Sequence, residues 1–183
     1  MSDYITEQVM AYFGRRLTDA GSLVQLAALR LYCRARIRGW CARLTAAITR
    51  RPGWLLDLDS IRDTHAIPGW YCSGTQTTPI SRIRGSAGRR SDFDLDFNPL
   101  NSRDKDRWLS VAAARIAAVP LPPVELIRVG DIWFVLDGHQ RISVARAMGE
   151  EEIEAVVAIW RITAPLPRAR APTWHRTVRQ LAY

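Results

Sequence analysis

Residues 137–141, Asp-Gly-His-Gln-Arg, combine the residue types of this chain that are best suited to bind phosphate. They follow the apolar run 132–136 and precede a helical pattern, so we expect Gly138 at a strand-to-helix turn. A glycine there lets the backbone approach a ligand closely. The first turn of the helix would also present unpaired amide groups and the positive end of its dipole. The sequence therefore predicts an anion site at this turn.

The side chains of the turn suggest both binding and chemistry. Arg141 can fork onto phosphate oxygens, and His139 can donate a hydrogen bond or act as an acid or base near neutral pH. We therefore consider His139 and Asp137 as candidate catalytic groups. The alternative is that Asp137 and His139 cap the helix and satisfy one another, while Arg141 pairs with a surface carboxylate. The residues expected to bind phosphate or nucleotide are Gly138, His139, Gln140, Arg141 and Ser143.

The elements that must position this turn are a mixture of helices and strands. A Gly130-Asp131 pair is typical of a tight hairpin, and Gly149 is typical of a helix end. The patterns predict an α+β fold, with a small, mixed, curled sheet and helices, preceded by a long N-terminal helical extension. Strands are expected at 78–83, 124–129, 132–136 and 153–159, a basic loop at 85–90, and helices at 104–119 and 140–148.

The N-terminal extension has the pattern of a basic amphipathic helix over residues 22–50. Arg36, Arg43 and Arg50 lie seven residues apart along one edge and are candidates for binding DNA, or an acidic membrane surface. The alternative is that the apolar stripe of the helix packs on the domain or on a second copy, forming a homodimer. The stripe consists of Leu26, Leu29, Cys33, Ile37, Trp40, Leu44 and Ile48.

Charge divides the chain into unequal parts. The net charge is +8, and all but one of the 26 basic residues are Arg. Residues 1–53 supply +6 of this charge, so nucleic acid or anionic lipid is a plausible partner, although charge alone selects neither. We predict a helical extension at 1–53, a linker with a possible short helix at 54–76, a domain at 77–160 and a Pro/Arg-rich tail at 161–183.

The cysteines and the first residues indicate a cytoplasmic protein. Cys33, Cys41 and Cys72 form neither a CxxC pair nor a metal-ligand spacing, which fits a reducing compartment. The start lacks the basic and apolar regions of a signal peptide. No apolar run approaches the length of a membrane span.

The order of the elements, together with four short segments, resembles the ParB N-terminal-like domain of the ParB/sulfiredoxin-like superfamily, over about residues 77–160. The Asp-Gly-His-x-Arg form of the turn is most similar to free serine kinases and to many bacterial members. The matching turn is Gly-Glu-Arg-Arg in partition ParB proteins, where it contacts nucleotide phosphates, and Gly-Cys-His-Arg in sulfiredoxins. The segments are 79–83 (Pro-Ile-Ser-Arg-Ile), 122–126 (Pro-Pro-Val-Glu-Leu), 134–141 (Phe-Val-Leu-Asp-Gly-His-Gln-Arg) and 143–147 (Ser-Val-Ala-Arg-Ala).

This resemblance implies a bound nucleotide (ATP, ADP or CTP), with or without Mg²⁺, and a phosphotransferase or nucleotide hydrolase activity. Because His139 stands at the sulfiredoxin cysteine, sulfinic acid repair is not expected. The residues after 160 leave no room for a helix-turn-helix module, so we do not expect a centromere-binding partition protein. The alternative functions are a non-enzymatic DNA-associated module gated by nucleotide, and a regulatory or structural partner whose motif is vestigial.

Asp92, Asp94 and Asp96 alternate with apolar residues and match by position the catalytic base of the serine kinases, although no one of them can be chosen. On a strand they would share one face and could bridge Mg²⁺ to phosphate. The favoured alternative is that the apolar residues are buried while the acids face water or pair with Arg89 and Arg90. No metal ligand is therefore assigned.

Overall fold

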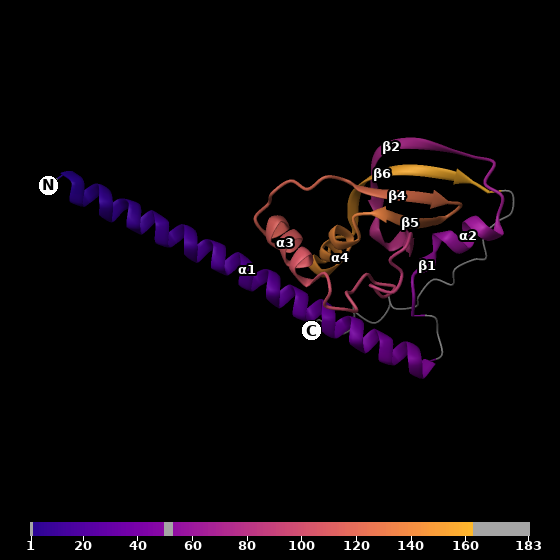
Figure 1. Ribbon diagram of the computed structural model, residues 1–183, viewed down its shortest axis with the longest axis horizontal. Coiled ribbons are helices and arrows are strands. Elements are labelled where there is room, and N and C mark those ends of the chain that lie inside the picture. The colour runs from indigo at the N-terminus through magenta and orange to yellow at the C-terminus, as the bar shows by residue number, and fades with distance from the viewer. Residues whose placement is uncertain (1, 50–52, 163–183) are drawn as a thin grey trace, which may run out of the picture.

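The computed structural model describes residues 2–49 and 53–162, with side chains from Gly21 onward. Figure 1 shows helix α1 as a long rod that lies against the rest of the protein and extends beyond it. The predicted α+β fold with a mixed sheet and a long N-terminal helix is confirmed. The elements are α1 (Ser2–Thr49), β1 (Leu56–Asp57), α2 (Leu58–Thr64), β2 (Gly69–Pro79), the 3-10 helix η1 (Ile80–Arg82), β3 (Ile83–Ser86), α3 (Lys105–Ile116), β4 (Val124–Val129), β5 (Ile132–Asp137), α4 (His139–Met148) and β6 (Glu152–Arg161).

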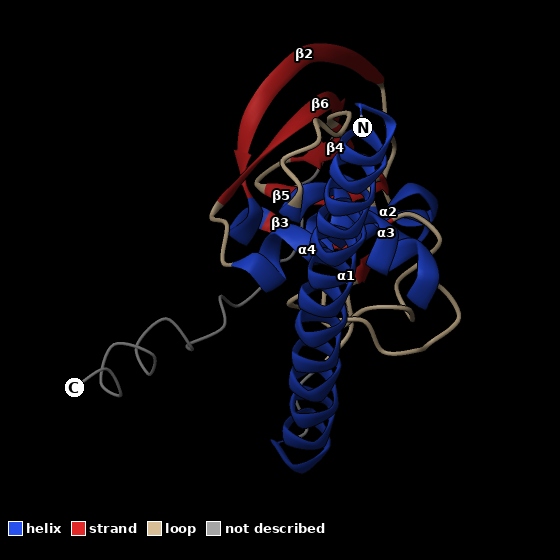
Figure 2. Ribbon diagram, turned by 90° about the vertical axis from the view of Figure 1, so that its left-hand side faces the viewer, coloured by secondary structure: helices blue, strands red, loops and turns tan. Residues whose placement is uncertain are grey.

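The strands of the described residues form one six-stranded sheet in the order β1-β3-β5-β4-β6-β2. Strand β3 is parallel to β1 and to β5, and β4 is parallel to β6. The hairpin pair β4–β5 and the pair β2–β6 are antiparallel. Figure 2 shows β2 and β6 as a curved pair at one side of the sheet. The sheet therefore places the end of β5, and the 137–141 turn that follows it, near its middle.

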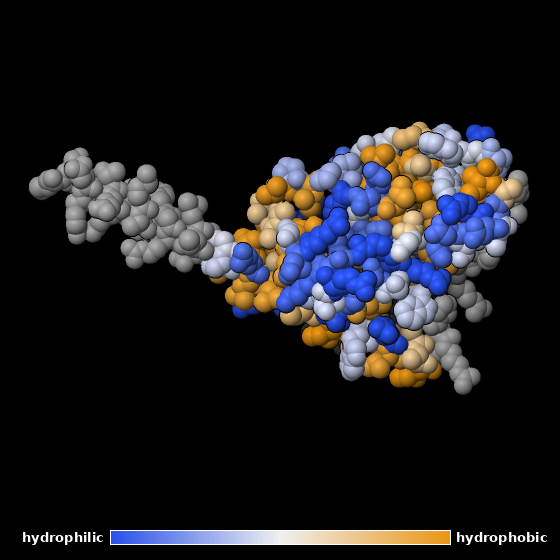
Figure 3. All heavy atoms as spheres, viewed as in Figure 1, coloured by the Kyte–Doolittle hydropathy of each residue, from blue (hydrophilic) through white to orange (hydrophobic). Residues whose placement is uncertain are grey.

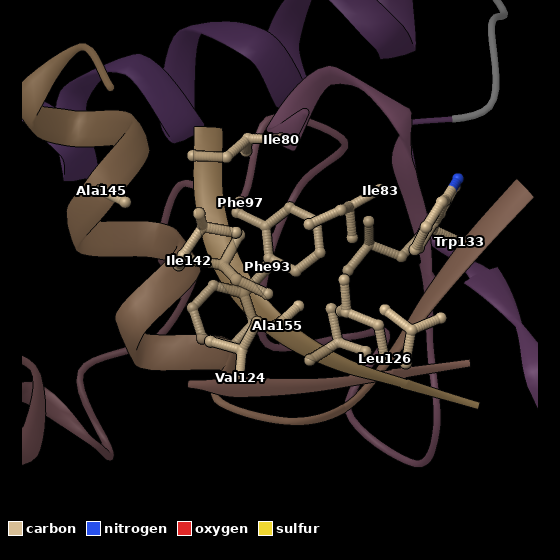
Figure 4. Close-up of a cluster of buried hydrophobic side chains, with 14 residues drawn as sticks. Ile80, Ile83, Phe93, Phe97, Val124, Leu126, Trp133, Ile142, Ala145 and Ala155 are labelled. Carbon is tan, nitrogen blue, oxygen red and sulfur yellow. The ribbon is translucent and has the colours of Figure 1, made fainter. Parts of the chain in front are cut away.

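Both faces of the sheet are covered. On one face, side chains from β4, β5 and β6 pack with Ile142 of α4 and with Phe93 and Phe97 of the loop after β3, as Figure 4 shows. On the opposite face, Leu58 of α2 packs with Ile127 and its neighbours. Consecutive residues of β4 and β5 enter opposite clusters because side chains alternate across a strand. Helix α4 is thereby fixed against the sheet directly after the turn.

Helix α1 packs on α3 and α4 through small residues. The Tyr32 ring meets the Trp108 ring edge-on, with 5.2 Å between their centroids. A side chain at Gly39 would place its Cβ 3.1 Å from Asn98 Cβ, so the helix lies close to the loop there. The buried residues of this contact are Ala28, Tyr32, Ala35, Trp108, Ala112 and Val144. The extension thus shares a core with the domain that it precedes.

The apolar stripe of α1 does not pack on the domain, which was one of the two alternatives considered for it, the other being a second copy. Ile37, Trp40 and Ile48 are 61%, 64% and 82% exposed. The domain instead contacts the opposite side of the helix, where Ala28 and Ala35 allow a close approach. Large apolar residues define the stripe in the sequence, but small ones define the face that packs.

Two other expectations differ from the structure. The predicted linker 54–76 contains β1, the short helix α2 and most of β2, and buries Leu55 and Leu58 in the core. The predicted strand 78–83 is interrupted, because β2 ends at Pro79 and η1 precedes β3. Most of the predicted tail, 163–183, lies outside the described residues.

Candidate phosphate-binding site

The predicted strand-to-helix turn is present at Gly138, between β5 and α4. Its φ is 98°, and a Cβ at this position would lie 2.5 Å from Val124 Cγ1, so the turn requires glycine. The first amide of α4 with an intrahelical acceptor is that of Ile142, which donates to Gly138 O at 3.0 Å. The preceding amides at 139–141 have no carbonyl of the helix to bond, which is the usual arrangement at an anion-binding helix start.

His139 is buried beside this helix start. Its Nε2 lies 2.7 Å from Ser86 Oγ, and its ring stacks on Phe93 with 6.0 Å between centroids. Burial, helped by the positive charge of Arg89, lowers the pKa of His139 from 6.5 to about 4. The imidazole is therefore neutral at pH 7, and its pKa lies below the range expected for acid or base chemistry near neutral pH.

Arg141 uses its guanidinium within the protein. Nη1 donates to the carbonyl oxygens of Pro122 at 2.6 Å and Pro123 at 2.9 Å, and Nη2 donates to Asp137 Oδ2 at 2.7 Å. The pairing with Asp137 corresponds to the alternative considered for Arg141, in which it binds a carboxylate. Arg141 thereby holds the segment before β4 against the turn.

Gln140 and Ser143 are both buried, but only Gln140 is among the residues that line the cleft in front of the turn. Gln140 Nε2 donates to Asp104 Oδ2 at 3.4 Å, and among the described residues its Oε1 accepts no hydrogen bond. Ser143 Oγ accepts from Trp108 Nε1 at 2.8 Å. Because Ser143 contacts α3 and does not line the cleft described next, the structure separates it from the other predicted phosphate ligands.

A cleft of about 410 Å³ opens in front of the turn. Its wall joins residues 137–141 to Arg89 from the loop after β3, Arg107 from α3, and the apolar side chains of Leu121 and Leu136. Arg89 pairs with the carboxylate of Asp92 in its own loop and with that of Asp104, the residue before α3. Arg107 is exposed and forms no salt bridge with the described residues. Three guanidinium groups and one carboxylate, that of Asp137, line this cleft.

Sequence reasoning did not assign Arg89 or Arg107 to the site. Arg89 lies in the predicted basic loop, a position that is suggestive of anion binding. Arg107 is one of several charged residues around the start of a helix, and nothing in its local pattern distinguishes it. Only the packing of α3 beside α4 brings Arg107 to the turn.

Two of the three predicted DNA-binding arginines, Arg36 and Arg43, lie on α1 and do not line the cleft. Arg36 Nη1 donates to Pro99 O at 3.5 Å, and the Arg43 guanidinium lies 5.8 Å from the centroid of the Trp54 ring. Arg50 lies outside the described residues. The structure therefore does not join these arginines to the phosphate-binding turn.

The three alternating aspartates do not share a strand face. Asp94 is buried and accepts from the amides of Asp96 at 2.9 Å and Asn98 at 2.8 Å, so it organises a loop. Burial raises the pKa of Asp94. Asp92 pairs with Arg89, as the favoured alternative proposed. The described residues contain no group of three or more His, Cys, Asp or Glu side chains arranged to hold a metal ion.

Comparison with known proteins leaves the geometry as the basis for assigning a function. The chain matches no protein-family model, and no curated protein matches its sequence. Within residues 2–49 and 53–162, no helix is long and apolar enough to cross a membrane.

Proposed function

We propose that this protein binds a nucleotide at the 137–141 turn and belongs to the ParB/sulfiredoxin-like superfamily. The observation that carries the proposal is that the start of α4, entered through Gly138, opens onto a cleft lined by three arginines. The amides at 139–141, which have no carbonyl of the helix to bond, and the helix dipole favour an anion there, and guanidinium groups favour phosphate. The volume of about 410 Å³ falls within the range of small-molecule sites.

The lining gives each part of a nucleotide a suitable partner. Phosphate oxygens would meet the amides of the first turn of α4 and the guanidinium of Arg107. Leu121 and Leu136 offer apolar surface to a base or ribose. Arg141 acts as a positioning residue, because its donors already hold the protein backbone.

The geometry supports binding more than acid–base catalysis through His139. A group with a pKa of about 4 is a weak base at neutral pH. Asp137 is the one carboxylate among the residues that line the cleft, and it remains the candidate for proton transfer in a phosphotransferase or nucleotide hydrolase.

The test is a thermal-shift and calorimetric titration of the full chain with ATP, ADP and CTP, with and without Mg²⁺. A nucleotide that binds the folded state raises the melting temperature by mass action. Arg107→Ala should weaken binding about tenfold or more, the scale of one charged hydrogen bond. Arg103→Ala, which removes an exposed arginine close in sequence that does not line the cleft, should leave the affinity unchanged.

Two results would refute the proposal. The first is that none of the three nucleotides raises the melting temperature. The second is that a nucleotide does bind, but that Arg107→Ala and Arg103→Ala have equal affinities for it. Binding would then depend on general positive charge and not on the cleft.

A further inference from the structure

Helix α1 carries an apolar surface that the rest of the described protein does not cover. We call it the outer stripe. At 100° per residue its members fall within an arc of roughly 100°, on the side of the helix opposite Ala28 and Ala35. Its members are Leu23 (65% exposed), Leu26 (44%), Ile37 (61%), Trp40 (64%), Leu44 (45%) and Ile48 (82%).

Arginines border the outer stripe on both sides. The helical positions of Arg34 and Arg38 place them along one edge, and those of Arg36 and Arg43 along the other. Arg30 lies within the stripe. Residues 20–56 contain neither Asp nor Glu. A surface that covers the stripe must therefore be apolar at its centre and negatively charged at its borders.

A second copy of the chain does not meet this requirement. Pairing two outer stripes would bring arginine edges together, and would bury Arg30 in a stretch of the helix, residues 21–49, that has no acidic residue to pair with it. Nucleic acid offers the negative charge, but its phosphate backbone gives no reason for an exposed stripe of Leu, Ile and Trp. An anionic lipid surface offers both properties.

We propose that α1 binds the surface of an anionic membrane through the outer stripe and lies in the plane of the interface. Apolar side chains would enter the boundary between headgroups and acyl chains, where Trp40 is well suited. The flanking arginines would bind lipid phosphates. In Figure 1, α1 forms the lower margin of the molecule, and in Figure 3 apolar patches, with hydrophilic ones between them, lie along that margin, so a flat bilayer could contact it below the domain.

The experiment is flotation of the full chain with vesicles of phosphatidylglycerol and phosphatidylcholine, compared with vesicles of phosphatidylcholine alone. The protein should float with the anionic vesicles, less so at high salt, and remain behind with the neutral ones. Ile37→Ser combined with Trp40→Ser should weaken the binding at least about tenfold, because two side chains lose their apolar burial.

Charge is tested by Arg34→Glu combined with Arg43→Glu, which reverses one arginine on each edge. Binding should fall at least about thirtyfold, since each cation near an anionic surface contributes to partitioning. The matched control is Arg62→Glu combined with Arg161→Glu, which changes the net charge equally but lies on α2 and β6. This control should bind nearly as well as the unmodified chain. Circular dichroism and melting temperatures show that each variant is folded.

Several outcomes would overturn the proposal. One such outcome is that the unmodified chain fails to float with anionic vesicles at low salt. Another is that Ile37→Ser with Trp40→Ser binds the anionic vesicles as well as the unmodified chain does. A third is that the charge control loses as much binding as Arg34→Glu with Arg43→Glu. A dimer seen by sedimentation that Ile37→Ser with Trp40→Ser dissociates would identify the stripe as an interface between copies.

Discussion

His139 should make the stability of the protein depend on pH between about 4 and 6.5. In this window the unfolded chain takes up a proton at the histidine, whereas the folded protein does not. The pKa of the folded state is the lower one, so the free energy of unfolding falls as the pH falls. The slope is at most about 1.4 kcal/mol per pH unit, and the total loss is about 3 kcal/mol once the pH is below both pKa values.

The assay is urea denaturation followed by tryptophan fluorescence at a series of pH values across this window. The quantity of interest is the difference between the unmodified chain and His139→Gln, which should have lost this part of the pH dependence. Asp94, whose pKa is raised by burial, acts with the opposite sign, but it is present in both proteins and cancels in the difference. His65→Gln, at a half-buried position outside the cleft, is the matched control for replacing a histidine by glutamine.

Equal pH slopes for the unmodified chain and His139→Gln would refute the reasoning. Such a result would mean that the folded protein protonates His139 as readily as the unfolded chain does. The imidazole would then be hydrated in the folded protein. Its contact with Ser86, made as a neutral group, could then not explain its burial.

Two further changes test the turn and the extension. Gly138→Ala should lower the free energy of unfolding by at least about 2 kcal/mol, because its Cβ would lie 2.5 Å from Val124 Cγ1. The same change should abolish the nucleotide-dependent thermal shift. Gly88→Ala, also at positive φ but with nothing within 4 Å, should cost about half as much and keep the shift. Deleting residues 1–53 should lower the melting temperature by exposing Trp108, and an unchanged melting temperature would show that α1 does not contribute to the core.

The elements nearest the turn could be predicted because their signals are local. The β4–β5 hairpin follows from two apolar runs around Gly130, and α4 follows from its position between Gly138 and Gly149. Strand β2 was missed because Gly69–Pro79 is mostly polar or exposed, and because it is stabilised by β6, some eighty residues further along the chain. Sequence-distant pairing of this kind leaves no periodic pattern to detect.

The candidate site was predictable in position but not in the roles of its side chains. The turn at Gly138 could be located from the sequence. The hydrogen bond that Arg141 donates to Pro122 O, in contrast, depends on how the segment before β4 folds back. The neutral state of His139 depends on burial against Phe93 and Ser86, which come from a loop and a strand far along the chain. Charge and hydrogen-bonding capacity are properties of a residue, but protonation and availability are properties of its surroundings.

Strand β2 has a consequence for how the protein behaves at high concentration. It forms one border of the sheet in the described residues, so its outer amide and carbonyl groups could template a strand from another molecule and start aggregation. The register shift between Cys72 and Gly74 breaks the regular ladder, and Gly74 has a φ of 81°. Pro79 ends the strand without an amide donor. Because of these irregularities β2 is not a long, flat edge strand, so a strand of another molecule cannot pair along its length. They therefore protect the protein from edge-to-edge aggregation.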